Sequence, residues 1–308
     1  PVLREMHLNS LARFETFAEQ FDFSYEHRGS FYACNTASGF EHKIEDARIA
    51  GRAGIHTEIL GPDEIAKLIP ETRVSAVGGV FYPEDSHLQP AQFVRALAQE
   101  AERLGTTIHS DTQVLGFDAV GGRVQTVRTT RGNFGADTFV LAAGSWSPPV
   151  VSDLGLRLPI QPAKGYSITF KRPENCPSIP VMMTEAKVGV TPMADTFRFA
   201  GTLELAGLDM TINQRRVSSI LNAMPSYFPD MSADKMEMIE IWRGLRPCTP
   251  DGLPLMGRTG KFDNLVIGAG HATIGISLGP ESGKILSDIV LGNEIGYDPG
   301  MLSPDRFN

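Results

Sequence analysis

Two short motifs in the C-terminal third carry residue types suited to binding an anion. Arg246 is followed by Pro247, and a planar guanidinium can hold a carboxylate by two parallel hydrogen bonds. A Gly-x-Gly turn, Gly268 to Gly270, separates an apolar strand predicted over 264–267 from a helix predicted over 271–290. Glycine lets a ligand approach the backbone, and the free N–H groups at the positive end of the helix then face that ligand.

Arg246 also has a structural interpretation, a salt bridge to Asp251 or Glu240. We favour the carboxylate site because a fixed Arg-Pro motif is more informative than a single charge. The nearby Arg243 is expected to be structural. Two arginines and two prolines within 243–251 predict a tight loop, which a strand over 236–242 leads into.

Composition narrows the class of protein. Of the 308 residues 42% are hydrophobic, which is enough for a core in one large or two interleaved domains. The net charge is −8. The chain has no basic runs, which excludes a typical nucleic-acid binder. Its 3 cysteines lack C-x-x-C spacing and form no zinc-type cluster with the 7 histidines, so we expect no metal and a cytoplasmic setting.

The remaining sequence predicts helices alternating with strands and two sheets. No apolar stretch approaches the roughly 20 residues of a transmembrane helix, and peripheral attachment to the inner membrane stays open. Apolar spacing and proline positions predict helices over 2–21, 40–51, 61–69, 90–105 and 213–228. Strands are predicted over 29–33, 77–82, 107–118, 122–130 and 133–142, the last three as one sheet. A second, antiparallel sheet is predicted over 160–170, 181–184, 188–192 and 197–205.

Several longer runs resemble one known family. GLRPCTPDGLPLMG, followed by NLVIGAGHATIGISLGPESGKILSDIV, resembles the end of the D-amino acid oxidase-like FAD enzymes, above all the bacterial D-amino acid dehydrogenase small subunit. RVQTVRTTRGNFGADTFVLAAGSWSPPV, PIQPAKGYSITF and YDPGMLSPDRF extend the resemblance over nearly the whole chain. The Gly-x-Arg-Pro motif and the later Gly-His-x-x-x-Gly turn are fairly specific as a pair, whereas either alone is weak.

The resemblance implies a mixed α/β (α+β) fold with two interleaved domains. A Rossmann-like FAD-binding domain would take residues 90–155 and 250–308, and an antiparallel-sheet substrate domain would take 156–249, with helical and substrate-domain elements in 1–89. Family members normally begin with a strand, a G-x-G-x-x-G turn and a helix. That fingerprint is not found in the sequence, so the FAD-binding domain is expected to lack its first βαβ unit here.

The resemblance also implies the site residues. Arg246 would bind the substrate α-carboxylate, Tyr166 would cap the substrate pocket, and His271 would approach the flavin. The implied cofactor-binding positions are Val114, Ala143, Gly144, Trp146, Gly270, His271, Ala272, Thr273, Ile274, Gly275, Ile276 and Ser277. Structural alternatives are a half-buried strand tyrosine for Tyr166, a backbone-only role for His271, and core packing for Trp146.

The implied chemistry is oxidation of a D-amino acid by non-covalently bound FAD. A hydride would pass from the substrate Cα to flavin N5, and the imino acid would hydrolyse to a 2-oxo acid and ammonia. The electron acceptor implied is respiratory. Related alternatives are a D-hydroxyproline or other amine dehydrogenase, or a sarcosine/glycine oxidase-like enzyme. A different class of protein is a truncated, non-catalytic subunit that binds no flavin by itself, and a homo-oligomer or partner subunit stays open.

Overall fold

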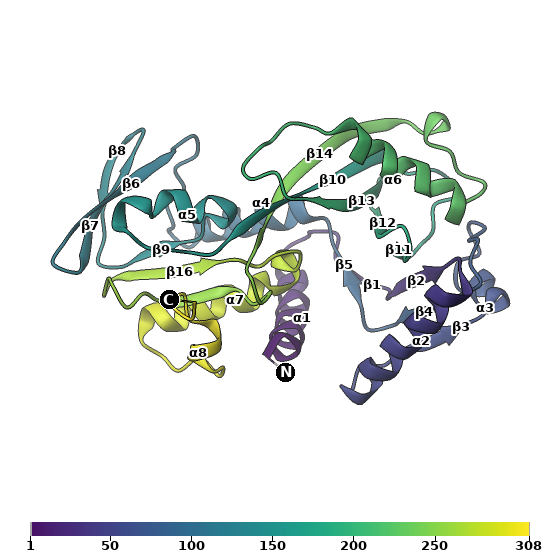
Figure 1. The fold of residues 1–308 in the computed structure, drawn as a ribbon, viewed down its shortest axis with the longest axis horizontal. Helices are drawn as coiled ribbons and strands as arrows, with labels where there is room; N and C mark the ends of the chain where they lie inside the picture. Colours follow the sequence, from purple (N-terminus) through teal and green to yellow (C-terminus); the bar gives the residue numbers. More distant parts are fainter. Residues whose placement is uncertain (1, 308) are drawn as a thin grey trace.

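An eight-stranded sheet forms one side of the molecule in Figure 1. The structure is a computed structural model that describes residues 2–307. From edge to edge the strands are β14 (Met238–Cys248), β10 (Gln161–Lys171), β13 (Thr196–Glu204), β12 (Val188–Met193), β11 (Val181–Met183), β2 (Ser30–Cys34), β4 (Gly78–Tyr82) and β3 (Glu58–Leu60). Neighbours are antiparallel except β11 and β2, which are parallel. The four strands predicted to form an antiparallel sheet do pair antiparallel, as β10, β13, β12 and β11. The prediction missed that the sheet continues through the parallel pair β11–β2, which makes the whole sheet mixed.

The two faces of this sheet differ in character. On one face, alternate apolar residues such as Ile168 and Phe199 pack against Ile220 and Met224 of helix α6 (Gln214–Tyr227). Helices α2 (Ala37–Arg52) and α3 (Pro62–Leu68) lie beside the β2–β4–β3 end. Side chains alternate along a strand, so Arg246 and the residues two and four positions before it in β14 occupy the other face.

A second, three-stranded sheet lies on the opposite side of the molecule (Figure 1). It consists of β15 (Leu255–Arg258), β16 (Leu265–Ala269) and β9 (Phe139–Leu141), with β16 parallel to β9 and antiparallel to β15. Helices α1 (Val2–Gln20), α7 (Gly275–Leu291) and α8 (Pro299–Leu302) share a core with β15. In this core Met6 of the first helix contacts residues from the C-terminal part of the chain.

The remaining elements are smaller. Strands β6 (Val114–Val120), β7 (Arg123–Thr129) and β8 (Gly132–Gly135) form an antiparallel sheet, and β1 (Glu26–His27) pairs with β5 (Ser86–His87). The other α-helices are α4 (Pro90–Arg103) and α5 (Ser147–Val150). Three short 3-10 helices occur as well: η1 (Gly144–Trp146) directly before α5, η2 (Ser152–Leu154) directly after it, and η3 (Ala233–Lys235) between α6 and β14. No helix within residues 2–307 is both long and apolar enough to span a bilayer.

Two predictions about the sheet expected over residues 107–142 were wrong. The predicted strand 107–118 begins only at Val114. The predicted strand 133–142 is two strands: β8 stays with β7, whereas β9 pairs with β16. The physical difference is burial, because β8 is exposed along its length while Phe139 and Leu141 of β9 are buried.

Two further corrections concern the anion-binding motifs. The predicted loop 243–251 is strand up to Cys248, because β14 pairs with β10 over its whole length. Pro247 is tolerated there because β14 is an edge strand. The helix predicted from residue 271 begins only at Gly275. The N–H of Ala272 donates to the Pro247 carbonyl, and this contact holds the residues before Gly275 in a turn.

Candidate active site

The parallel pair β9 and β16 brings two of the predicted segments to one sheet edge. Parallel strands end at the same edge, and ligands of α/β folds bind at the carboxyl ends of such strands. After β9 the chain enters the turn Ala143 to Trp146, and after β16 it enters the turn Gly270 to Ile274 that leads into α7. These two turns hold most of the predicted cofactor-binding positions.

The start of α7 presents free hydrogen-bond donors. Its cap residue Ile274 offers no side-chain acceptor, and within residues 2–307 the backbone N–H groups of Gly275, Ile276 and Ser277 have no partner. Ile274 itself donates to the His271 carbonyl at 3.0 Å. Three unpaired N–H groups at the positive end of a 17-residue helix form an anion-facing surface.

Gly270 is required by the geometry of this turn. Its φ is +84°, a conformation that side chains disfavour, and a Cβ there would lie 2.6 Å from Cγ2 of Thr249. Ala272 also has a positive φ, +46°, held by the hydrogen bond from its N–H to the Pro247 carbonyl at 2.9 Å. The turn is therefore fixed against the end of β14.

The end of β14 joins both turns. Cys248 forms an isolated antiparallel bridge with His271. On the other turn, the Ser145 hydroxyl donates to the Leu245 carbonyl at 3.3 Å, and a Cβ on Gly144 would lie 4.0 Å from Cγ of Pro247. The structure thus brings Arg246, η1 and the α7 turn together, although they are far apart in the sequence.

Arg246 lacks the structural salt bridge that was its alternative interpretation. Asp251 pairs with Arg306 at 2.9 Å, and Glu240 lies 3.9 Å from Arg198. Within residues 2–307 no carboxylate lies within 4.0 Å of the Arg246 guanidinium, which donates from Nη1 to the Thr202 carbonyl at 3.1 Å. Burial lowers the pKa of Arg246 below its usual value. The arginine is a partly desolvated cation with donors still available.

Tyr166 is not brought to Arg246. It pairs with Arg243, three residues from Arg246 along β14, so Tyr166 and Arg246 lie on opposite faces of the sheet. The Tyr166 ring is 1% exposed, and its hydroxyl donates to Oε2 of Glu204 at 2.7 Å. Arg243 donates from Nε to the Met210 carbonyl at 2.8 Å. The sheet therefore separates a structural arginine and tyrosine from Arg246.

The His271 side chain points into the fold. Its Nε2 lies 2.9 Å from the Ser282 hydroxyl of α7. Burial lowers the pKa of His271 to about 4, so the ring is neutral at physiological pH. The backbone of His271, through its bridge to Cys248 and its carbonyl, shapes the turn directly.

The start of α7 opens into a cavity of about 780 Å³. Thr273, Ile276 and Ser277 form part of its wall. Arg198, on the Arg246 face of the large sheet, lines it as well. Other walls come from α1 and from the segment Tyr82 to Leu88. Patterns in the sequence gave no sign of Arg198 or of the α1 residues, because periodicity does not show which elements meet around a cavity.

The cavity also holds unsatisfied polar atoms. Both ring nitrogens of His87 are buried, and neither makes a hydrogen bond of normal geometry to any group in residues 2–307. Burial lowers the pKa of His87. Unpaired buried nitrogens are unfavourable unless a ligand or water satisfies them. Together with the free N–H groups of α7, they make this cavity fit a ring system that carries several acceptors.

The predicted cofactor positions Val114 and Trp146 are exposed to solvent. Val114 is the first residue of β6, 37% exposed, in the small antiparallel sheet. Trp146 ends η1 and is 46% exposed, so it is not the core aromatic of its alternative interpretation. The structure places Trp146 in the turn after β9 and Val114 at the start of β6, in a different sheet.

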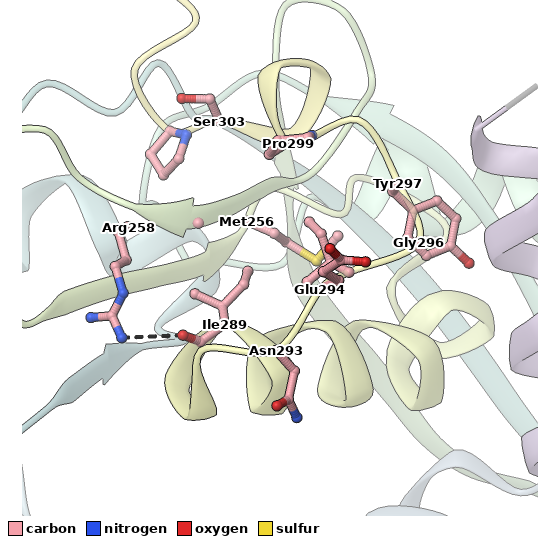
Figure 2. A pocket seen from close by; sticks show the side chains of 12 residues that line it. Met256, Arg258, Ile289, Asn293, Glu294, Gly296, Tyr297, Pro299 and Ser303 are labelled. Atoms are coloured by element: carbon pink, nitrogen blue, oxygen red, sulfur yellow. Dashed lines mark hydrogen bonds between the residues drawn. The ribbon is translucent and has the colours of Figure 1, made fainter.

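A second cavity of about 660 Å³ lies at the far end of α7 (Figure 2). Arg258 on its wall donates to the carbonyls of Asp263 at 2.9 Å and Ile289 at 3.1 Å. A cation beside the last carbonyls of a helix stabilises the helix end. This arginine is therefore engaged in capping α7, unlike Arg246. Within residues 2–307, no group of three His, Cys, Asp or Glu side chains is arranged to hold a metal ion.

Comparison with known proteins identifies the relatives of this chain. The sequence profile of the family described as FAD dependent oxidoreductase matches residues 2–289. The D-amino acid dehydrogenase of Vibrio atlanticus (strain LGP32) is 32% identical over 93% of this chain and 70% of its own length. That of Agrobacterium fabrum (strain C58) is 33% identical over 93% of this chain and 69% of its own length.

Solved structures share the fold. Glycine oxidase from Geobacillus kaustophilus superposes with a TM-score of 0.91 and 23% identity, covering 99% of this chain and 83% of that one. Glycine oxidase from Bacillus cereus gives 0.88 and 24%, covering 97% and 83%. L-proline dehydrogenase from P. horikoshii gives 0.86 and 18%, covering 98% and 82%. At these identities the likeness shows the fold alone.

Proposed function

Because the chain belongs to the family of FAD-dependent oxidoreductases, it is a flavoenzyme, and we propose that it oxidises D-amino acids. The curated relatives at 32–34% identity are D-amino acid dehydrogenases. The observation that carries the proposal is the Arg246 cation, which has no carboxylate partner among residues 2–307 and lies on the sheet face that carries Arg198 of the α7 cavity. Such a cation is suited to the α-carboxylate that all amino acids share.

The proposed roles follow from the contacts of each group. FAD, bound non-covalently, would accept the hydride from the substrate Cα. The N–H groups of Gly275, Ile276 and Ser277 would donate to acceptors at one edge of the flavin, and the helix dipole would favour negative charge there. Arg246 would hold the substrate carboxylate and so fix the position of its Cα. The product would be an imino acid, which water converts to a 2-oxo acid and ammonia.

We also propose the division of labour within the chain. Residues 90–155 and 250–308 would bind FAD, through η1 and the start of α7. Residues 156–249, with elements of 1–89, would bind the substrate through the large sheet. The electron acceptor would be a respiratory component rather than oxygen. Negligible hydrogen peroxide formation, together with fast reduction of a quinone analogue, is the result expected in a steady-state assay.

The test combines a spectrum with a matched pair of variants. The purified chain, incubated with FAD and freed of excess, should show a flavin absorbance spectrum that bleaches when D-amino acids are added without oxygen. Arg246→Ala should retain the flavin spectrum yet bind the substrate about a hundredfold more weakly, because two charge-assisted hydrogen bonds are lost. Arg243→Ala removes the same charge from the opposite face and should leave substrate affinity within about twofold.

Two outcomes would contradict the proposal. A colourless protein after incubation with FAD would contradict cofactor binding by this chain. A coloured protein that bleaches with glycine or L-proline but not with D-amino acids would contradict the substrate class.

A further inference from the structure

We propose that Gly165 and the bulge at Thr202 position the Arg246 guanidinium for the substrate carboxylate. Arg246 stands on β14, yet its side chain extends over the neighbouring strand β10 to reach a carbonyl on β13. Gly165 lies on β10 directly between. This inference rests on the proposed function, because it concerns how the proposed carboxylate-binding group is held.

The bulge lies in β13 where it pairs with β10. Lys164 pairs with Glu204 and Tyr166 pairs with Gly201, so Gly165 alone faces both Thr202 and Leu203. Thr202 has a φ of +64°, which is strained for a β-branched residue. Bulges turn a residue out of the ladder and are common beside active sites. Here the bulged residue's carbonyl accepts from Nη1 of Arg246 at 3.1 Å.

Gly165 leaves the space that the guanidinium fills. The three atoms nearest to a Cβ built on Gly165 are Nη1, Cζ and Nη2 of Arg246, all well inside van der Waals contact. Even an alanine would therefore displace the guanidinium. The obstacle is the end of a flexible side chain and not the backbone, so the chain can still fold while the cation moves.

Together these features restrict the guanidinium from two directions. The Thr202 carbonyl accepts a hydrogen bond from Nη1, and the guanidinium packs over the Gly165 backbone in the space that a Cβ would fill. An arginine has five N–H donors in a planar fork. With its position fixed, the remaining donors keep a defined direction for a carboxylate, and less side-chain entropy is lost on binding. We therefore assign Gly165 and Thr202 as positioning residues.

The test uses Gly165→Ala with Gly189→Ala as its control. Gly189 lies on the same face of the same sheet, but a Cβ there would make only ordinary contacts, 3.5 Å from Met182 and 3.9 Å from the Ala200 carbonyl. Gly165→Ala should raise KM for D-alanine and the calorimetric Kd for propionate about tenfold, with a much smaller change in kcat. The flavin spectrum and thermal midpoint should match those of Gly189→Ala. Equal KM and Kd for the two variants would overturn the inference.

A double variant separates this inference from the proposed function. In an Arg246→Ala background the new methyl meets no guanidinium, so Gly165→Ala should have no further effect on propionate binding or on stability. If Gly165→Ala alone failed to fold, recovery of folding in the double variant would support the inference, and continued unfolding would overturn it. If Arg246→Ala itself left propionate binding unchanged, that result would contradict the proposed carboxylate site, whatever the effect of Gly165→Ala.

Discussion

Arg243 and Arg246 show how three residues of spacing separate two sets of contacts in one strand. An odd spacing places their side chains on opposite faces of β14. Arg243 contacts the Met210 carbonyl in the loop that precedes α6, whereas Arg246 reaches toward Thr202 on the cavity face. The charge is the same, so the difference in role comes from the face that each side chain occupies.

The shape of the Arg246 side chain should matter as well as its charge. Arg246→Lys keeps a cation but replaces the planar fork by a point charge. We expect KM for D-amino acids to rise about tenfold, with a smaller change in kcat. Steady-state kinetics at saturating acceptor measures both. A KM equal to that of wild type would show that a single charge is sufficient.

His271 predicts a pH dependence of stability. The folded protein keeps the ring neutral, with a pKa of about 4, against an unfolded value near 6.5. The unfolded chain therefore takes up the proton first as pH falls. The stability from this residue is present above pH 6.5 and is lost progressively as pH falls toward 4.

The magnitude can be measured by urea unfolding. Between about pH 7 and pH 5, His271 should account for a loss of roughly 2 kcal/mol in the free energy of unfolding. In His271→Gln that part of the pH dependence should disappear, while the contributions of His7 and His87, whose pKa values burial also lowers, remain. Identical pH dependence in the two proteins would exclude a buried neutral His271.

Some residues of the candidate site could be predicted from the sequence and others could not. Arg246 could be singled out because an arginine beside a proline in a known pattern is visible in the sequence. Gly165 and Thr202 could not, because the bulge depends on the register between β10 and β13. Tyr166 was selected from its neighbours in the sequence, but only the pairing with Arg243 shows that it faces away.

Helices and strands were predicted best where one pattern determined them. Helix α4 starts at Pro90, and α6 covers Gln214–Tyr227, both within a residue or two of the prediction. The start of α7 was misplaced because His271 to Ile274 are held in a turn by contacts with β14. The strand β15 was not predicted at all, since its four residues show no period-2 pattern.

Helices α1 and α7 are joined by a polar cluster. Glu281 on α7 is 4% exposed, pairs with Arg13 of α1 at 2.6 Å, and accepts from the Tyr297 hydroxyl at 2.8 Å. The Glu281 carboxylate is shielded from water although the Arg13 side chain is 37% exposed, so the buried carboxylate depends on its donors. The cluster fixes α1 beside the helix whose start lines the cavity.

Removing the carboxylate should therefore weaken this contact. Glu281→Ala should lower the free energy of unfolding by about 2 kcal/mol, because Arg13 and Tyr297 lose their shared acceptor. The matched control is Glu45→Ala, which removes an exposed pair with Arg48 on α2 and should change stability by less than about 0.5 kcal/mol. Urea unfolding curves measure both. Equal effects would show that burial of the pair adds nothing.

Across the whole molecule, the large sheet separates its apolar core from the face proposed to bind the substrate. Its α6 face holds the largest apolar core, and its other face carries Arg246 and Arg198. The opposite faces share a backbone but few side-chain contacts. Changes in the core should therefore alter the free energy of unfolding more than they alter the geometry at Arg246.

Ile220→Ala tests this separation. Ile220 is 0% exposed in the core under α6, and its truncation should lower the free energy of unfolding by about 3 kcal/mol. Propionate affinity should remain within about twofold of wild type. Ser219→Ala, at the exposed neighbouring position, should change neither quantity. A large loss of affinity in Ile220→Ala would mean that the core transmits strain through the sheet.

The contact between the first and last long helices has a consequence for biosynthesis. Met6 is fully buried among Leu278, Ile285 and Leu302, which are translated long after α1. Until those residues emerge, the nascent chain exposes the apolar side chains of α1 without their partner, a state that favours chaperone binding. Strand β2 likewise awaits β11, its parallel neighbour. Because α1 and α7 both line the larger cavity, the nascent chain should gain affinity for FAD only after α7 has been translated.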